Sequence, residues 1–172
     1  MGEPGAPQLR RVVCGKTASG GWGVLADAMA TATETMKVQG APFGVTHLWA
    51  ADEPGLDPAD RTPLAGLPEI FSLGPGSTRF LVESMGPTPE PTGWHRTNTI
   101  DLEYIVSGEI DLFMEDGSSV TLRRGDVNVQ LGGVHQWWNR SAVPCVLLIV
   151  MIGVPSDETP GLVDVEQSGG ER

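Results

Sequence analysis

The sequence is poor in positive charge and has no long apolar stretch. Lys and Arg together supply 11 of the 172 residues against 22 Asp and Glu, which gives a formal net charge of -11. A surface of this charge repels nucleic acids and anionic membranes, so we expect neither as a partner. No run of 18 or more apolar residues occurs, so we also expect no membrane-spanning helix.

Cysteine is equally scarce. The two cysteines, Cys14 and Cys145, lie far apart and lack the spacing of a metal site. Cys145 falls within the apolar run PCVLLIVMIG, where a cysteine behaves as a small buried hydrophobic residue. The beginning of the chain, MGEPGAPQLRR, has no apolar core of the kind that a secretory signal needs. We therefore expect a cytoplasmic protein with reduced cysteines.

Turn-forming residues are abundant, with 23 Gly and 14 Pro. Short apolar segments alternate with these turns, and Asp116-Gly117 is a typical hairpin turn. Evenly spaced short strands of this kind predict an all-β fold with two packed sheets, a jelly roll. Two segments differ from this pattern of short alternating strands. Residues 26–39 are rich in Ala and Met and could form two or three helical turns or an ordered excursion. The run 145–153 lacks alternation, which predicts burial on both faces.

The chain divides into three regions by composition. Residues 1–42 are expected to form N-terminal strands and an irregular arm, residues 43–154 a β-barrel, and residues 155–172 a polar tail. Within the barrel, a strand over 44–50 would place His47 and Trp49 on one face, and a strand over 78–84 would place Phe80 on one of its faces.

The stretch from Gly93 to Asn139 carries two motifs. The first is a glycine, a histidine, an acidic residue and a closing glycine, and the second is two glycines followed by a histidine and an asparagine. The positions are Gly93, His95, Thr97, Asp101 and Gly108 (93–108), then Gly125, Gly132 or Gly133, His135 and Asn139 (125–139). This pattern resembles the paired motifs of the cupin superfamily. The resemblance implies a double-stranded β-helix, the jelly-roll barrel of the cupins.

A subgroup of small bacterial and fungal cupins is similar in more detail. Its members carry strands of the form TIDYxxVLSGEI and GDxVVQRGTxHAWxN, and the segments TIDLEYIVSGEI and GDVNVQLGGVHQWWN of this chain resemble them. Related single cupins act in polyketide and aromatic pathways as cyclases, decarboxylases or dehydratases. The chain departs from the subgroup at Leu131 and Gly133, where Arg and Thr are usual, so an inherited substrate does not follow.

The departures from the wider family fall on the metal ligands. A typical cupin uses three histidines and one glutamate, and the resemblance assigns these positions to His95, Thr97, His135 and Asp101. Three possibilities follow. In the first, His95, Asp101 and His135 hold one divalent ion (Fe, Mn, Ni or Zn). In the second, His47 or Glu103 replaces the missing histidine. In the third, no metal binds and the two histidines act as general acid and base groups.

Several further residues are candidates for the pocket. Large flat side chains beside the candidate histidines suit an apolar or aromatic ligand, and a strand amide could bind a carbonyl group. The predicted pocket residues are His47, Trp49, Phe80, Gln130 and Trp137.

The sequence thus predicts an enzyme that acts on a small molecule. The leading reaction is of lyase or cyclase type, the decarboxylation or dehydration of an apolar or aromatic carbonyl-bearing substrate. The resemblance to the subgroup suggests a polyketide-related compound. His95, His135, Glu103 and Asp101 are the predicted catalytic residues, with Glu103 as the general base. A non-haem iron dioxygenase and a non-catalytic ligand-binding cupin remain open as alternatives. We expect a homodimer and no nucleotide cofactor.

Overall fold

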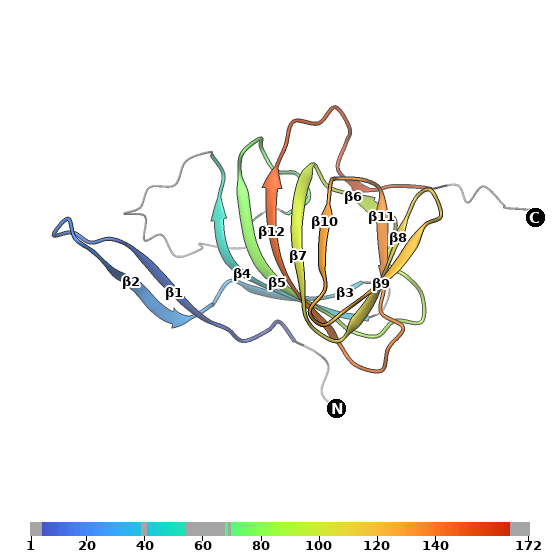
Figure 1. The fold of residues 1–172 in the computed structure, drawn as a ribbon, viewed down its shortest axis with the longest axis horizontal. Helices are drawn as coiled ribbons and strands as arrows, with labels where there is room; N and C mark the ends of the chain where they lie inside the picture. Colours follow the sequence, from blue (N-terminus) through green and yellow to red (C-terminus); the bar gives the residue numbers. More distant parts are fainter. Residues whose placement is uncertain (1–4, 39–40, 54–67, 69, 166–172) are drawn as a thin grey trace, which may run out of the picture.

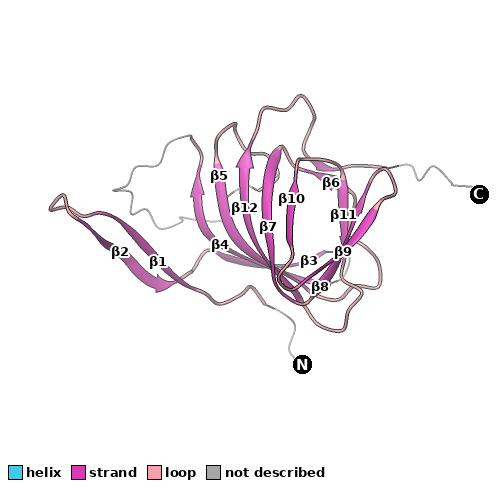
Figure 2. Cartoon of the chain, in the orientation of Figure 1, coloured by secondary structure: helices cyan, strands magenta, loops and turns pink. Residues whose placement is uncertain are grey.

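The computed structural model describes residues 5–38, 41–53, 68 and 70–165. The described residues form strands and loops without a helix, as Figure 2 shows. None of them forms a helix that is long and apolar enough to cross a membrane. The predicted all-β fold is therefore confirmed.

Two antiparallel sheets face each other and enclose the core (Figure 1). The larger sheet has the strand order β10-β7-β12-β5-β4-β3 and the smaller has the order β13-β6-β11-β8-β9. The strands of the larger sheet are β3 (Thr33–Val38), β4 (Ala41–Ala51), β5 (Thr78–Met85), β7 (Thr99–Ser107), β10 (Val127–Gln130) and β12 (Cys145–Gly153). Those of the smaller sheet are β6 (His95–Arg96), β8 (Glu109–Met114), β9 (Ser119–Arg123), β11 (His135–Trp138) and β13 (Gly161–Leu162).

A hairpin of β1 (Arg10–Lys16) and β2 (Trp22–Met29) stands away from this barrel (Figure 1). It exposes apolar side chains, among them Trp22 at 72% and Val24 at 60%. Such a projecting apolar arm suits contact with a second copy of the chain. The expected homodimer stays a prediction.

Within the segment 26–39, the structure describes residues 26–38, and none of these is helical. Residues 26–29 complete β2, and residues 33–38 form β3, which pairs with β4 at the edge of the larger sheet. Ala and Met favour a helix, but this intrinsic preference is weak compared with pairing to a neighbouring strand. The larger sheet therefore begins before residue 43, and β13 adds a short strand beyond residue 154.

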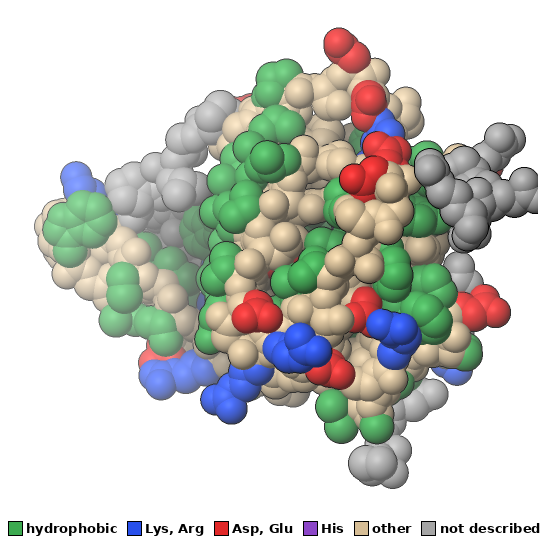
Figure 3. Space-filling model, turned by 45° about the vertical axis from the view of Figure 1, so that its right-hand side comes forward, with side chains coloured by type: hydrophobic (Ala, Val, Ile, Leu, Met, Phe, Trp, Pro, Cys, Tyr) green, Lys and Arg blue, Asp and Glu red, His purple; other side chains and the backbone are tan. Residues whose placement is uncertain are grey.

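Strand β12 lies in the middle of the larger sheet, between β5 and β7. Its residues alternate between fully and partly buried, so the prediction of burial on both faces is wrong. Cys145, Leu147, Ile149 and Met151 face the core, and Cys145 is wholly buried as predicted. The other face of this region of the sheet is apolar but partly exposed, as at Leu102 and Tyr104 on β7. Figure 3 shows hydrophobic side chains spread over one face of the molecule and no histidine there.

Glycine is needed at the turn that joins β7 to β8. Gly108 has a φ of 79°, and a Cβ at this position would lie 2.6 Å from the carbonyl oxygen of Pro144. Both the positive φ and the close backbone approach exclude a side chain. This turn closes the first motif and holds the beginning of β8 against the beginning of β12.

Candidate active site

A cavity of about 680 Å³ opens between the two sheets. The larger sheet contributes Glu83, Asp101, Glu103, Ile149 and Met151 to its wall, and the smaller contributes His95, His135 and Trp137. A cavity of this size and mixed lining is typical of a small-molecule site. All four predicted catalytic residues and the predicted pocket residue Trp137 line it.

The two motif histidines lie side by side. His135 on β11 is directly opposite His95 on β6 in the antiparallel register. Their ring centroids are 4.3 Å apart. Motif spacing predicted that both histidines belong to one site, and the short pairing of β6 with β11 brings them together.

Each imidazole is oriented by a backbone carbonyl two residues earlier in the chain. Nδ1 of His95 lies 3.0 Å from the Gly93 oxygen, and Nδ1 of His135 lies 2.8 Å from the Gly133 oxygen. A carbonyl can only accept a hydrogen bond, so Nδ1 must carry the proton in both rings. In the neutral form, each Nε2 then keeps a free lone pair.

Both imidazoles favour this neutral form. Burial lowers the pKa of His95, although the hydrogen bond to Gly93 opposes the change. Burial and the adjacent His95 lower the pKa of His135 to about 4. Desolvation disfavours the charged form of a histidine, so at neutral pH the pair presents two unprotonated nitrogens.

Three carboxyl groups face the cavity from the larger sheet. Burial raises the pKa of Asp101 to about 6 even though hydrogen bonds with Thr99 and Thr97 lower it. Burial also raises the pKa of Glu103 to about 7, against a 2.7 Å hydrogen bond from the side chain of Asn128. Burial and the neighbouring carboxylates raise the pKa of Glu83 to about 8.

Glu83 was not predicted from the sequence. The strand signal over 78–84 was correct, but Phe80 was assigned to the pocket when the opposite face of β5 lines it. Glu83 and Met85 point into the cavity, so residues of even number such as Phe80 point away from it. The sequence gives no signal for Glu83, because β5 has apolar residues on both faces.

A β-bulge explains the displacement of Trp49. The register between β4 and β5 pairs His47 with Leu81 but Trp49 with Phe80, so one residue of β4 is skipped. A bulge of one residue reverses the facing of everything that follows it. Trp49 therefore shares the face of Phe80 and not that of His47, and neither Trp49 nor Phe80 lines the cavity.

His47 and Gln130 are buried beside the site without lining it. Nε2 of His47 lies 3.1 Å from the Glu34 carboxylate, which gives this histidine a structural partner. Gln130 is opposite Asp101 in the sheet register, and its amide donates to the Gly133 oxygen at 3.3 Å. Gln130 thus stabilises the turn that precedes His135.

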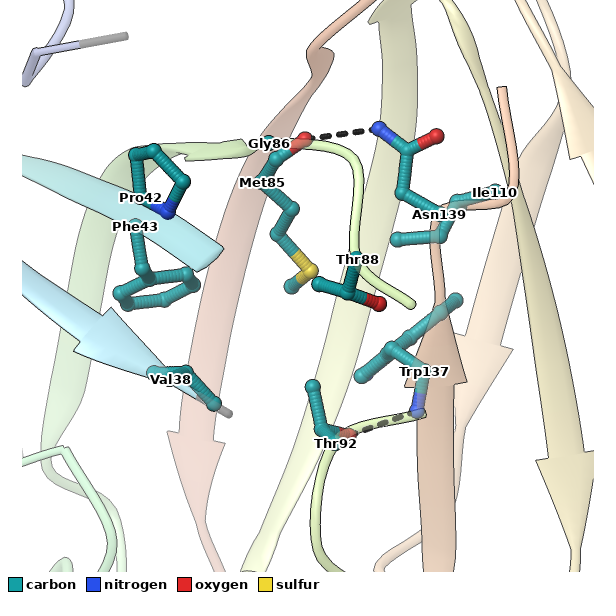
Figure 4. A pocket seen from close by; sticks show the side chains of 10 residues that line it. All are labelled: Val38, Pro42, Phe43, Met85, Gly86, Thr88, Thr92, Ile110, Trp137 and Asn139. Atoms are coloured by element: carbon teal, nitrogen blue, oxygen red, sulfur yellow. Dashed lines mark hydrogen bonds between the residues drawn. The ribbon is translucent and has the colours of Figure 1, made fainter. Parts of the chain in front are cut away.

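A small apolar recess adjoins the cavity. This recess, of about 20 Å³, is drawn in Figure 4 and shares Phe43, Met85 and Trp137 with the main cavity. Two hydrogen bonds hold its walls: the Asn139 side-chain amide donates to the Met85 oxygen at 2.8 Å, and the Trp137 amide donates to the Thr92 hydroxyl at 2.9 Å (Figure 4). The motif asparagine therefore has a structural role.

The residues fit a metal ion only in part. The two imidazoles have the free Nε2 lone pairs and the backbone-oriented Nδ1–H groups that metal-binding histidines show. Among the described residues, however, no three His, Cys, Asp or Glu side chains form a group that could hold a metal ion. Asp101 therefore does not join His95 and His135 in the predicted three-residue metal site. Thr97, which stands where a typical cupin has its second histidine, also lines the cavity.

Comparison with known proteins yields matches over parts of the chain. No family model matches. The chain is 43% identical over 74 residues to phomopsin biosynthesis cluster protein D of Diaporthe leptostromiformis, covering 43% of this chain and 38% of that protein. It is 40% identical over 45 residues to the cupin-domain-containing oxidoreductase virC of Hypocrea virens, covering 26% of this chain and 23% of that protein. The chain thus spans well under half the length of these relatives.

Among solved structures, the DMSP lyase DddQ from Ruegeria pomeroyi DSS-3 matches with a TM-score of 0.47 and 18% identity. The match covers 73% of this chain and 54% of that one. The motif residues and the two facing antiparallel sheets agree with the resemblance to the cupins, and the chain is similar over part of its length to a cupin-domain-containing protein.

Proposed function

We propose that the cavity is the active site of an enzyme that moves a proton next to the carbonyl group of a small apolar or aromatic substrate. The overall reaction would be of lyase or cyclase type, a decarboxylation or a dehydration. The observation that carries the proposal is the pair of oriented imidazoles, which face carboxyl groups of raised pKa across one cavity. Perturbed titratable groups gathered in one pocket are typical of active sites.

The carboxyl groups divide the acid and base roles. A pKa of about 7 leaves Glu103 partly ionised at neutral pH, so it can take a proton from carbon and return it. A pKa of about 8 keeps Glu83 mostly protonated, so its O–H can donate to the oxygen on which negative charge develops. Buried carboxyl groups that keep a proton at neutral pH are a recurrent solution for enolate chemistry.

The histidine pair orients the substrate. Each free Nε2 can accept a hydrogen bond from a substrate hydroxyl or enol, while the backbone carbonyls of Gly93 and Gly133 hold the rings. In a dehydration, the proton taken from carbon goes to Glu103, and the hydroxyl leaves as water with a proton from a carboxyl group. Trp137 and Ile149 provide the apolar surface on which a ring or chain would lie.

Proton exchange tests this proposal without knowledge of the natural substrate. The protein is incubated in D2O with a panel of aryl ketones and β-keto acids, and deuterium uptake next to the carbonyl is followed by NMR. We expect catalysed exchange that falls at least about 100-fold in Glu103→Gln and His135→Gln. His47→Gln is the matched control, because this histidine is outside the cavity and should leave the exchange unchanged. Exchange that survives both cavity substitutions, or exchange with no member of the panel, would contradict the proposal.

An oxygen-dependent oxidoreductase is the second candidate. The relative virC is described as an oxidoreductase, and the two Nε2 lone pairs are suitable donors for Fe(II). Oxygen consumption in the presence of Fe(II) and the same substrate panel would support this candidate. The absence of Fe(II)-dependent oxygen uptake, together with catalysed deuterium exchange, would favour the acid–base enzyme.

A further inference from the structure

The wall of the cavity that faces the histidines carries three carboxyl groups, and Lys37, the one Lys or Arg among the described lining residues, is not among the groups that act on their pKa values. Glu83, Asp101 and Glu103 lie on β5 and β7, and all are at least nine-tenths buried. Burying several carboxyl groups together is costly unless something positive accompanies them. This carboxylate wall (Glu83, Asp101 and Glu103) therefore needs an explanation that the fold alone does not give.

The hydrogen bonds to this wall are incomplete. Thr99 and Thr97 form hydrogen bonds with the Asp101 carboxyl group, but its Oδ1 is buried and accepts none. For Glu83, the described residues record neither a hydrogen bond nor an ion pair, and the charged groups that act on its pKa are all carboxylates: Glu103, Asp101 and Glu34. Across the cavity, the two histidines are held neutral and supply no positive charge.

Among the described residues, no three His, Cys, Asp or Glu side chains form a group that could hold a metal ion, and this includes the carboxylate wall. Asp101 and Glu103 are two residues apart along β7, so their Cα atoms are about 6.7 Å apart. Glu83 is two strands away and offset by two residues, since Leu147 of β12 pairs with Glu83 on one side and with Ile105 on the other, whereas Ile149 pairs with Glu103. An ammonium group on an organic molecule can lie among carboxylates that do not converge on one point.

The remaining lining favours an apolar molecule that carries this charge. Ile149, Met151 and Met85 surround the wall, and the rings of Phe43 and Trp137 complete the apolar surface. An aromatic ring stabilises an organic cation through its face. A fully hydrated inorganic ion would gain nothing from these contacts.

We propose that the carboxylate wall binds the ammonium group of an amine-bearing apolar substrate, with its apolar body on Trp137 and Ile149. The inference names the substrate class of the cavity and rests on the proposed function for its catalytic meaning. The binding itself requires no turnover.

Three probes of similar shape and different charge test the inference by calorimetry at pH 8.5. They are 2-phenylethylammonium, the neutral 2-phenylethanol and the anionic 3-phenylpropanoate. We expect the ammonium probe to bind the wild-type protein at least about tenfold more tightly than the alcohol, and the anion to bind more weakly than both. Equal affinity for the ammonium and the alcohol would overturn the inference, and this comparison needs no variant.

Two substitutions locate the charge. Glu83→Gln and Glu103→Gln should each weaken the ammonium probe at least about fivefold and leave the alcohol unchanged. Glu115→Gln, an exposed glutamate on the loop after β8, is the matched control and should change neither affinity. Ammonium binding that both cavity variants retain would place the site elsewhere and contradict the inference. Ammonium preference without deuterium exchange would refute the proposed function alone, and exchange without that preference would refute only this inference.

Discussion

The raised pKa of Glu83 makes the stability of the fold depend on pH. Glu83 is 9% exposed, and its pKa of about 8 compares with an ordinary value of 4.5. In the unfolded chain the carboxyl loses its proton near pH 4.5, whereas in the folded protein it keeps the proton until about pH 8. Between these values the folded state binds more protons, so the free energy of unfolding falls as the pH rises.

The size of the effect follows from the shift. Each pKa unit corresponds to about 1.4 kcal/mol. Between pH 5 and pH 8, the unfolded state is almost fully ionised at Glu83 and the folded state is not, so this residue alone removes about 3 kcal/mol of stability. Asp101 and Glu103 act in the same direction, because burial also raises their pKa values.

The Glu83→Gln substitution isolates this contribution. A neutral amide of the same shape does not titrate, so the variant should equal the wild type near pH 5 and exceed it by about 3 kcal/mol near pH 8. Urea unfolding followed by tryptophan fluorescence at several pH values measures the difference, and Glu115→Gln serves as the exposed control. A difference that does not change with pH would refute the assignment of a buried, protonated Glu83.

Two structural substitutions test the frame around the site. Asn139→Ala removes the amide that donates to the Met85 and Val143 oxygens, and it removes the side-chain oxygen that accepts from Ser141. We therefore expect the free energy of unfolding, measured with urea, to fall by about 3 kcal/mol. An unchanged urea midpoint would show that this buried network is dispensable. Gly153→Ala places a Cβ 2.1 Å from the Gly74 oxygen, so we expect a fall in the melting temperature that corresponds to about 3 kcal/mol. A normal melting temperature for this variant would show that the loop at Gly74 can move.

The sequence predicts the parts of the fold that depend on local chemistry. Turn glycines, the Asp116-Gly117 hairpin and the motif spacing are local signals, and they correctly indicate an all-β barrel in which His95 and His135 meet. Gly117 has a φ of 84°, as the predicted turn requires. Motif positions also predicted that Asp101 and Glu103 line one cavity, because residues two apart on a strand share a face.

The differences between the predicted and the observed pocket lining arise from the register between neighbouring strands. A single sequence does not contain this register. The bulge between His47 and Trp49 reverses the facing of Trp49, and the face of β5 that turns inward is decided by its neighbours β4 and β12. A strand such as β5, which has apolar residues on both faces, gives no signal to choose between Phe80 and Glu83. The helical alternative for residues 26–39 relied on weak propensity, whereas pairing with β4 decides the conformation of residues 33–38.

Both candidate functions depend on the state of the two cavity histidines. Nitrogen-15 NMR of uniformly labelled protein reads the protonation of each ring nitrogen, and His95→Gln and His135→Gln assign the signals. At pH 7 we expect both rings to be neutral with the proton on Nδ1 and a free Nε2, because Gly93 and Gly133 accept from Nδ1. A proton on Nε2 in either ring, or a charged imidazolium at pH 7, would contradict the account of this site.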